Sequence, residues 1–428
     1  MEGRTLNVAP TSGSIARPAR ALMISPILPM RSSNGLAMRM ALFAEALEVE
    51  YQLDLIVIPV AGRLTGGAAV SESTSVSIWE AESETHFRLL SQIADDEERL
   101  AAFRRYGKPS MSSALSQPVL NRIAKIVAAN RYDLVHIGRS YMLPAIDAID
   151  DDVPISVDLD EDDYISTMSM ADAAMRCSAA GQAARLVAEA EAYDHLIAAR
   201  RERLRLCFVS NEPARRTLKV RHATFEIAVS PNAVAIPERI RKRDDGCTLG
   251  FIGALGYWPN VEAIYWFVEK VLPRIHARSS LRPRLHVAGP DAPESLLRRA
   301  RRPGVDILGA VPDLCDFYRN ITVAIAPIRL GGPALRTKLI EAGAHSTAFI
   351  TTSVSASGMR ATSSPCGWIA KDAAAFSDAC IEALENSAER RRREQQGRHA
   401  ALMFYDRRRT VSALGAQMAA IGRRSPPI

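Results

Sequence analysis

The chain lacks the features that mark disulfide-stabilised and membrane-spanning proteins. Its six cysteines are scattered through 428 residues without a CxxC pair, which argues against a disulfide framework or a zinc site and favours a reducing cytosol. No apolar run reaches the roughly 18–20 residues of a membrane span. Residues 1–20 lack the apolar stretch of a signal peptide, so we expect a flexible N-terminal tail and a cytoplasmic protein.

A strong charge imbalance is also missing. Lysine and arginine number 54 against 48 aspartates and glutamates, which gives a formal net charge of +6. This mildly basic balance suits an anionic small molecule, nucleic acid or an acidic membrane surface, and it does not choose among them. The 47% of apolar and 24% of charged residues are ordinary for a globular protein.

What the chain does have is a repeated pattern of apolar strands and helical stretches. Its length exceeds the roughly 250–300 residues at which a single core stops growing, so two domains are expected. Continuous Val/Ile/Leu runs separated by helices indicate a parallel sheet with helices on both faces. Such runs occur in the first half at 21–29, 52–60, 132–138, 154–160 and 204–210, and in the second half at 247–255, 282–290, 304–310, 321–328 and 347–353.

This pattern predicts an α/β protein of two Rossmann-like, doubly wound domains that face a cleft. We place the first domain at 21–235, a linker at 236–246 and the second domain at 247–400. In such sheets ligands bind beyond the carboxyl ends of the strands, so the cleft is the expected site.

The segment GGPALRTKLIEAGAH, residues 331–345, combines glycines with charged residues at the start of a predicted helix. Glycines let backbone N–H groups approach an anion, and a helix N-terminus adds roughly half a positive charge. Arg336 and Lys338 would reinforce that field, while Glu341 shares the face of Lys338 and could accept hydrogen bonds from a ribose. Phosphate and ribose together describe a nucleotide diphosphate. The alternative is a surface pair between Lys338 and Glu341.

Several motifs resemble one known family. They are GALGYWPNVEAIYWFVEKVLPRI (253–275), HVAGP (286–290), the stretch at 307–344, the N-terminal loop SPILPMRSSNGLAMRM (25–40) and VSPNAV (229–234). Over about residues 21 to 415 the chain resembles the retaining glycosyltransferases of the GT-B fold, particularly the polysaccharide-type members of family 4. The resemblance also implies that residues 401–428 form a terminal helix that crosses back to the first domain, which would bind the acceptor.

The resemblance implies a hexosyltransferase of EC class 2.4 that acts in polysaccharide, glycoconjugate or natural-product biosynthesis. Its donor would be a UDP-, GDP- or dTDP-linked sugar and its acceptor a saccharide, a lipid-linked molecule or a natural product, with the anomeric configuration retained. We expect no nucleic-acid partner. Neither a metal nor a separate cofactor is expected, because helix dipoles and basic side chains can stabilise the departing diphosphate.

The same resemblance assigns roles to individual residues. Glu341 would bind the ribose and take part in catalysis, together with His136 and Arg139 on the acceptor side. Gly138 stands where many members have a histidine, and Pro333 where many have a first glutamate. Arg336, Lys338, Arg329 and the backbone at 331–335 would contact the diphosphate, Gly35 would let the backbone approach the donor closely, and Tyr257 could stack on the base. Besides Glu341, the expected donor-site residues are Gly35, Gly253, Tyr257, Arg329, Gly331, Gly332, Arg336 and Lys338.

Alternatives stay open at this point. The acidic run VDLDEDD (157–163) could hold Mg²⁺ or Mn²⁺, or form a loop at a strand end. The arginines of 389–398 and 406–409 could bind anionic lipids at the inner face of a membrane, or form a solvated helix face. Trp258 could join Tyr257 on a nucleobase or pack in the core. The activity itself could be that of a nucleotide-sugar epimerase, a phosphorylase or a degenerate nucleotide-sugar binder of the same architecture.

Overall fold

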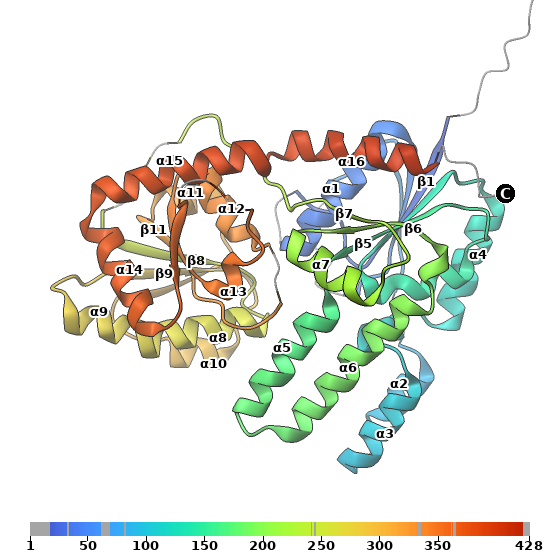
Figure 1. Cartoon of the computed structure of the whole chain (residues 1–428), viewed down its shortest axis with the longest axis horizontal. Coiled ribbons are helices and arrows are strands. Elements are labelled where there is room, and N and C mark those ends of the chain that lie inside the picture. Colours follow the sequence, from blue (N-terminus) through green and yellow to red (C-terminus); the bar gives the residue numbers. More distant parts are fainter. Residues whose placement is uncertain are drawn as a thin grey trace, which may run out of the picture.

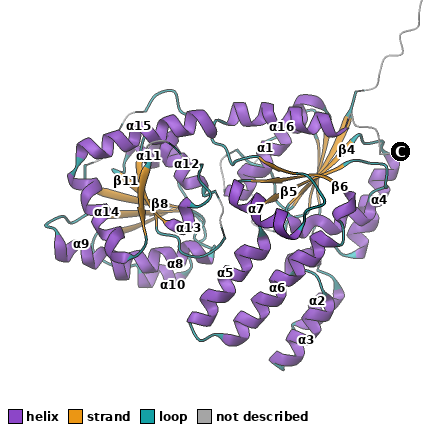
Figure 2. Ribbon diagram, viewed as in Figure 1, coloured by secondary structure: helices purple, strands orange, loops and turns teal. Residues whose placement is uncertain are grey.

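The computed structural model describes residues 18–422 except 32–33, 61–68, 81–82, 241, 244, 333–334, 361 and 363–364. It consists of two α/β domains placed side by side, each built on its own sheet (Figure 1). Helices cover both faces of each sheet, as Figure 2 shows. The predicted fold class is thereby confirmed.

The first sheet has seven strands in the order β3-β2-β1-β4-β5-β6-β7, and all of its pairings are parallel. The order reverses between β1 and β4, which places a topological switch point at their carboxyl ends. The strands are β1 (Arg20–Ser25), β2 (Gln52–Val57), β3 (Ser75–Ile78), β4 (Leu134–Gly138), β5 (Ile155–Asp160), β6 (Leu204–Val209) and β7 (Ile227–Val229).

The helices of this domain include a group that extends away from the sheet. Helices α5 and α6 form an antiparallel hairpin, with α2 and α3 beside it (Figure 1). The elements are α1 (Gly35–Glu50), α2 (Thr85–Leu90), α3 (Asp96–Tyr106), η1 (Ser110–Ala114), α4 (Gln117–Ala129), η2 (Ser140–Ala148), α5 (Asp163–Arg176), α6 (Ala180–Ala198), η3 (Arg201–Arg203) and α7 (Glu212–Arg221).

The second sheet repeats this topology with six parallel strands in the order β10-β9-β8-β11-β12-β13. Its switch point therefore lies between β8 and β11. The strands are β8 (Thr248–Ile252), β9 (Arg284–Ala288), β10 (Val305–Gly309), β11 (Val323–Ala326), β12 (Ala348–Thr352) and β13 (Gly367–Ala370). The helices are α8 (Trp258–Trp266), η4 (Phe267–Val271), α9 (Leu272–Arg278), α10 (Glu294–Arg299), α11 (Leu314–Arg319), α12 (Thr337–Ala344), α13 (Ser353–Ala356) and α14 (Ala373–Glu385).

Two C-terminal helices connect the domains. Helix α15 (Ser387–Phe404) packs on α12 of the second domain, and α16 (Arg407–Gly422) packs on α1 of the first (Figure 1). Between them Val234 and Asp406 form a parallel bridge that ties this crossing to the interdomain linker. The C-terminal helix thus returns to the first domain as predicted.

Two arginines of the run 389–398 take part in this packing. Arg393 lies over the ring of Trp368 at 4.1 Å and also bonds Gly367 O and Glu389. Arg398 donates to the carbonyls of Ala344 and Pro237, which fastens α15 to the second domain. None of the described helices has the length and apolar character needed to cross a bilayer.

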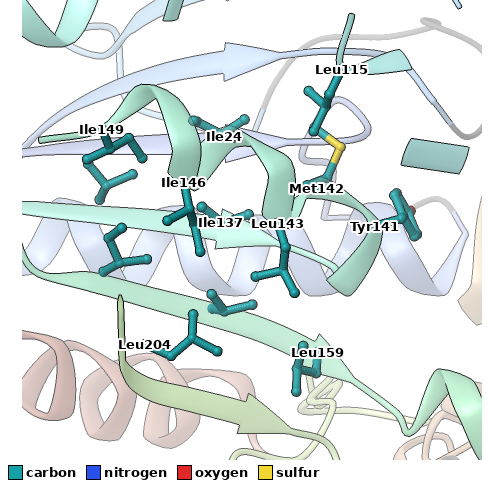
Figure 3. Close-up of a cluster of buried hydrophobic side chains, with 14 of the residues drawn as sticks. Ile24, Leu115, Ile137, Tyr141, Met142, Leu143, Ile146, Ile149, Leu159 and Leu204 are labelled. Atoms are coloured by element: carbon teal, nitrogen blue, oxygen red, sulfur yellow. The ribbon is translucent and has the colours of Figure 1, made fainter. Parts of the chain in front are cut away.

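Alternation along β1 places apolar side chains on both faces of the first sheet. Leu22 and Ile24 join one buried cluster, whereas Ala21 and Met23 join another. Figure 3 shows part of the first cluster, in which Leu143 and Ile146 of η2 lie beside Ile137 of the sheet. A smaller cluster crosses between the domains and includes Met38, Val234, Leu335, Ile340, Ala344, Ala401 and Tyr405. The start of α12 is thus held against the first domain.

Candidate functional site

The predicted phosphate turn leads from β11 into α12 at the switch point of the second sheet. Gly331 has φ 102°, a conformation that favours glycine, and a Cβ there would lie 2.8 Å from Arg336 Nη2. Arg336 folds back over the turn, and its Nη2 lies 3.4 Å from both Leu330 O and Gly332 O. Its buried Nε has no hydrogen-bond partner among the described residues. Pro333 lies outside the described residues.

Lys338 is partly buried at the first turn of α12. Its Nζ donates to Asn260 Oδ1 at 3.0 Å and lies 4.0 Å from the centre of the Phe251 ring. A Cβ at Gly253 would lie 2.7 Å from this Nζ, so the glycine leaves the space that the ammonium occupies. Burial, and next the charge of Arg336, lower the pKa of Lys338 to about 7. A nearby anion would restore the charged form.

Glu341 lies one turn further along the helix and is 7% exposed. The hydroxyl of Tyr318 donates to its Oε2 at 3.4 Å and lies 3.2 Å from Lys338 O. Burial raises the pKa of Glu341 to about 7, while Lys338 and Tyr318 oppose that shift. Lys338 and Glu341 therefore lie close together on one partly desolvated face of α12, as their separation of three residues predicted.

Arg329 and Tyr257 stand apart from this pair. Arg329 forms an ion pair with Glu262 of α8 and lies 5.0 Å over the ring of Trp266. This ion pair uses one nitrogen of the guanidinium, and the phosphate role of Arg329 stays a prediction. Tyr257 and Trp258 begin α8 and are 49% and 58% exposed, which fits a surface for a ligand better than core packing.

The first domain meets the turn at two glycines. A Cβ at Gly35 would lie 3.0 Å from Thr337 Oγ1, which shows how closely α1 approaches the start of α12. The N–H of Gly332 donates to Ser166 Oγ of α5 at 3.2 Å. Ser166 in turn donates to Glu161 at 2.6 Å. The amide of Gly332 is therefore committed to the first domain here, and would have to leave Ser166 to bind a phosphate.

Arg139 lies in a network of carboxylates at the carboxyl ends of β4 and β5. Its guanidinium donates to Asp163 at 2.7 Å and lies 3.2 Å from Asp160. Arg139 itself has φ 74°, an uncommon conformation for a residue other than glycine. Burial raises the pKa of Asp163 to about 7 against the opposing charge of Arg139. The catalytic role of Arg139 stays a prediction.

His136 requires a correction. Its imidazole has no exposed surface, stacks on Phe43 with 4.5 Å between ring centres, and bonds Ser156 Oγ at 2.9 Å. Burial, together with Arg39, lowers the pKa of His136 to about 3, so the ring is neutral at physiological pH. The predicted catalytic role does not fit this position, because a side chain inside the first domain's core cannot touch a substrate in the cleft.

The acidic run 157–163 is organised by arginines. Arg39 of α1 and Asp158 are both completely buried and form a bidentate pair at 2.7 and 2.6 Å. Arg39 also reaches Asp160 at 3.3 Å. Among the described residues no group of three or more His, Cys, Asp or Glu side chains is placed to hold a metal ion. These contacts favour the reading of 157–163 as an acidic loop at a strand end.

Sequence reasoning missed four residues that support the site: Asn260, Tyr318, Ser166 and Arg39. Asn260 belongs to the quoted YWPN motif and is 6% exposed, so a buried amide at a helix start was the available signal. The contacts of Ser166 with Gly332, of Tyr318 with Glu341 and of Arg39 with Asp158 join residues distant in sequence, and no local pattern indicates them.

Comparison with known proteins agrees with this architecture. Residues 246–386 match the family model described as "Glycosyl transferases group 1". No curated protein matches the chain.

Solved structures extend the comparison to nearly the whole chain. Sucrose-phosphate synthase from Thermosynechococcus elongatus is similar with a TM-score of 0.64 and 13% identity, over 94% of this chain and 98% of that one. A UDP-forming trehalose-phosphate synthase from Burkholderia vietnamiensis has a TM-score of 0.63 and 11% identity, over 96% of this chain and 99% of that one. HepE from Anabaena, in complex with UDP and glucose, has a TM-score of 0.60 and 9% identity, over 94% of this chain and 98% of that one. The chain thus has the GT-B fold of glycosyltransferases.

Proposed function

We propose that the protein is a retaining glycosyltransferase that binds a nucleotide sugar at the start of α12. The observation that carries the proposal is the pairing of Lys338 and Glu341 on one face of this helix, at the switch point of the second sheet. The carboxyl is buried and the amine partly buried, and desolvation displaces the pKa of each to about 7. Paired groups of this kind, perturbed in a cleft, are characteristic of ligand sites.

Each group has a distinct task in the proposed complex. The N-terminal dipole of α12 and the ammonium of Lys338 stabilise the diphosphate, with Arg336 adding a second positive charge. Glu341 accepts hydrogen bonds from the ribose hydroxyls. As the bond between the sugar and the diphosphate breaks, negative charge grows on the leaving oxygen, and the fixed positive groups stabilise it more strongly than they stabilise the intact donor.

The acceptor binds on the side of the first domain, near Arg139 and Asp163. We propose a hydroxyl acceptor that belongs to a saccharide, a lipid-linked molecule or a natural product, and a hexose as the transferred group. Because HepE was solved with UDP and glucose, UDP and UDP-glucose are the first ligands to test. GDP, dTDP and their sugars follow.

A thermal-shift screen against UDP, GDP, dTDP, ADP and their sugar conjugates tests the donor site. A ligand at a hundred times its dissociation constant stabilises a protein by about 2.7 kcal/mol, which such a screen detects. We expect one base to be selected. Glu341→Ala should then weaken that nucleotide by about 1.5–2 kcal/mol, the scale of hydrogen bonds to a charged group.

Glu294→Ala provides the matched control, because Glu294 is an exposed glutamate of the same domain, on α10. Its affinity should equal that of the wild type. Unchanged affinity in Glu341→Ala would remove the ribose role. Sugar release from the selected donor, with and without candidate acceptors, separates a transferase from a protein that only binds nucleotide sugar.

Tyr318→Phe is expected to weaken the selected nucleotide by about 3–10-fold, the worth of one ordinary hydrogen bond. The substitution removes the hydroxyl that contacts Glu341 and the carbonyl of Lys338 while keeping the ring that stacks on His345 at 4.7 Å. Isothermal titration of nucleotide and of free ribose phosphate measures the effect. An unchanged affinity for ribose phosphate would contradict the assignment.

A further inference from the structure

We propose that Asn260 is a positioning residue that holds the ammonium of Lys338 in place to bind the donor diphosphate. Asn260, Phe251 and Gly253 together form the seat of this ammonium. The inference rests on the proposed function, since it concerns the same site. Asn260 is the third residue of α8, comes from a segment far from α12 in sequence, and is 6% exposed. Among the described residues, its Oδ1 is the one hydrogen-bond acceptor for Lys338 Nζ.

The orientation of this amide is fixed by a second bond. Asn260 Nδ2 donates to the carbonyl of Ala254 at 2.8 Å. Because a carbonyl can only accept, the nitrogen must face Ala254 and the oxygen must face the lysine. The seat is therefore built into the loop that follows β8, and it does not depend on how Lys338 moves.

The rest of the seat is apolar and close-fitting. The ring of Phe251 lies under the ammonium at 4.0 Å, and Gly253 leaves the gap beside it. Gly253 N donates to Ala288 O at 3.0 Å, and a Cβ at Gly289 would lie 1.8 Å from Gly253 O. These contacts fix the backbone around the ammonium. One hydrogen bond and one ring leave two N–H donors of Lys338 for a ligand.

A neutral acceptor suits this task better than a carboxylate. Lys338 sits between Arg336, which repels its charge, and Glu341, which attracts it. Without a seat, the flexible lysine stem would let the ammonium turn toward Glu341, and both groups would be lost to the ligand. Asn260 holds the ammonium without neutralising it. The positive charge that Lys338 carries then stays available for phosphate, and Glu341 stays available for ribose.

The test is a double-mutant cycle with Asn260→Ala, Lys338→Met and both together. For the base that the wild type selects, affinities of the nucleoside diphosphate and of the nucleoside are measured by isothermal titration. Asn260→Ala should weaken the diphosphate about 5–10-fold and the nucleoside less than twofold, since its effect acts through the ammonium. In the Lys338→Met background the same substitution should have no further effect. Equal losses for both ligands, or a full effect without Lys338, would overturn the proposal.

A ligand-free measurement separates this inference from the proposed function. The chain has seven lysines, so lysine-selective ¹⁵N labelling gives few ammonium signals, and Lys338→Met identifies the relevant one. We expect Asn260→Asp to raise the pKa of Lys338, because a carboxylate replaces the neutral oxygen. An unchanged titration would refute the seat even if nucleotides bind. If no nucleotide stabilises the wild type but the titration shifts, the proposed function fails and the seat stands.

Discussion

Asp158→Asn is expected to lower the free energy of unfolding by about 3–5 kcal/mol, the cost of leaving one member of a buried ion pair unpaired. Asp158 and Arg39 have no exposed side-chain surface, and their two hydrogen bonds are 2.6 and 2.7 Å long. The asparagine keeps the volume of the side chain but removes the charge that compensates Arg39. Asp160 lies 3.3 Å from Arg39 and replaces only part of the lost charge compensation.

Urea unfolding of the purified chain measures this effect. Asp172→Asn is the matched control, because it makes the same chemical change at an exposed position of α5. This substitution should lower the free energy of unfolding by less than about 0.5 kcal/mol. The double variant Arg39→Met with Asp158→Leu should recover most of the loss, because no charge then stays buried. Equal stability of Asp158→Asn and the wild type would show that Asp160 alone supports the guanidinium.

The pair matters beyond stability because Arg39 also reaches the segment 229–234 that leads into the linker. Its Nη1 donates to Ser230 O at 3.0 Å and to Asn232 Oδ1 at 2.9 Å. Asn232 in turn donates to Leu335 O at 3.2 Å, in the turn that precedes α12. One buried guanidinium thus connects the first sheet, the segment before the linker and, through Asn232, the turn that precedes α12. We therefore expect Asp158→Asn to weaken nucleotide binding as well.

The fold could be predicted because its signals are local. Each strand is a short continuous apolar run, and each run is followed by a helical stretch, which is the pattern of a doubly wound parallel sheet. The pairing of Lys338 with Glu341 was predictable for the same reason, since positions three apart share a helix face.

What the sequence could not supply was long-range contact. The Arg39–Asp158 pair joins residues 119 positions apart, and Asn260 lies 78 positions from Lys338. His136 shows the opposite failure. A histidine in an apolar strand can face the cleft or the core, and only the packing of Phe43 and Phe208 around it decides for the core.

The affinity for nucleoside diphosphate is expected to fall as pH rises above 7, by up to about 50-fold between pH 7 and pH 9. Burial and Arg336 lower the pKa of Lys338 to about 7. Below this value the free protein already carries the ammonium. Above it the amine must take up a proton before it can bind phosphate, which costs up to about tenfold in affinity per pH unit until the pKa of the complex is reached.

Measuring the affinity for the nucleoside as well as for the nucleoside diphosphate at each pH isolates the contribution of Lys338. Glu341 also titrates near pH 7, but it affects both ligands through the ribose, so the ratio of the two affinities cancels its contribution. The terminal phosphate, with a second pKa near about 6, is fully ionised over this range. Isothermal titration in buffers of different ionisation enthalpy should also show proton uptake when the diphosphate binds.

Lys338→Met and Lys338→Arg decide the assignment. The methionine variant should bind diphosphate weakly at pH 7 with a ratio that no longer changes with pH. The arginine variant stays charged at every pH tested and should also lose the slope, while it keeps a positive charge for phosphate. A slope that persists in Lys338→Met would mean that another group takes up the proton. If the affinity of Lys338→Met for the diphosphate at pH 7 also equalled that of the wild type, the ammonium at the start of α12 would have no part in holding the diphosphate.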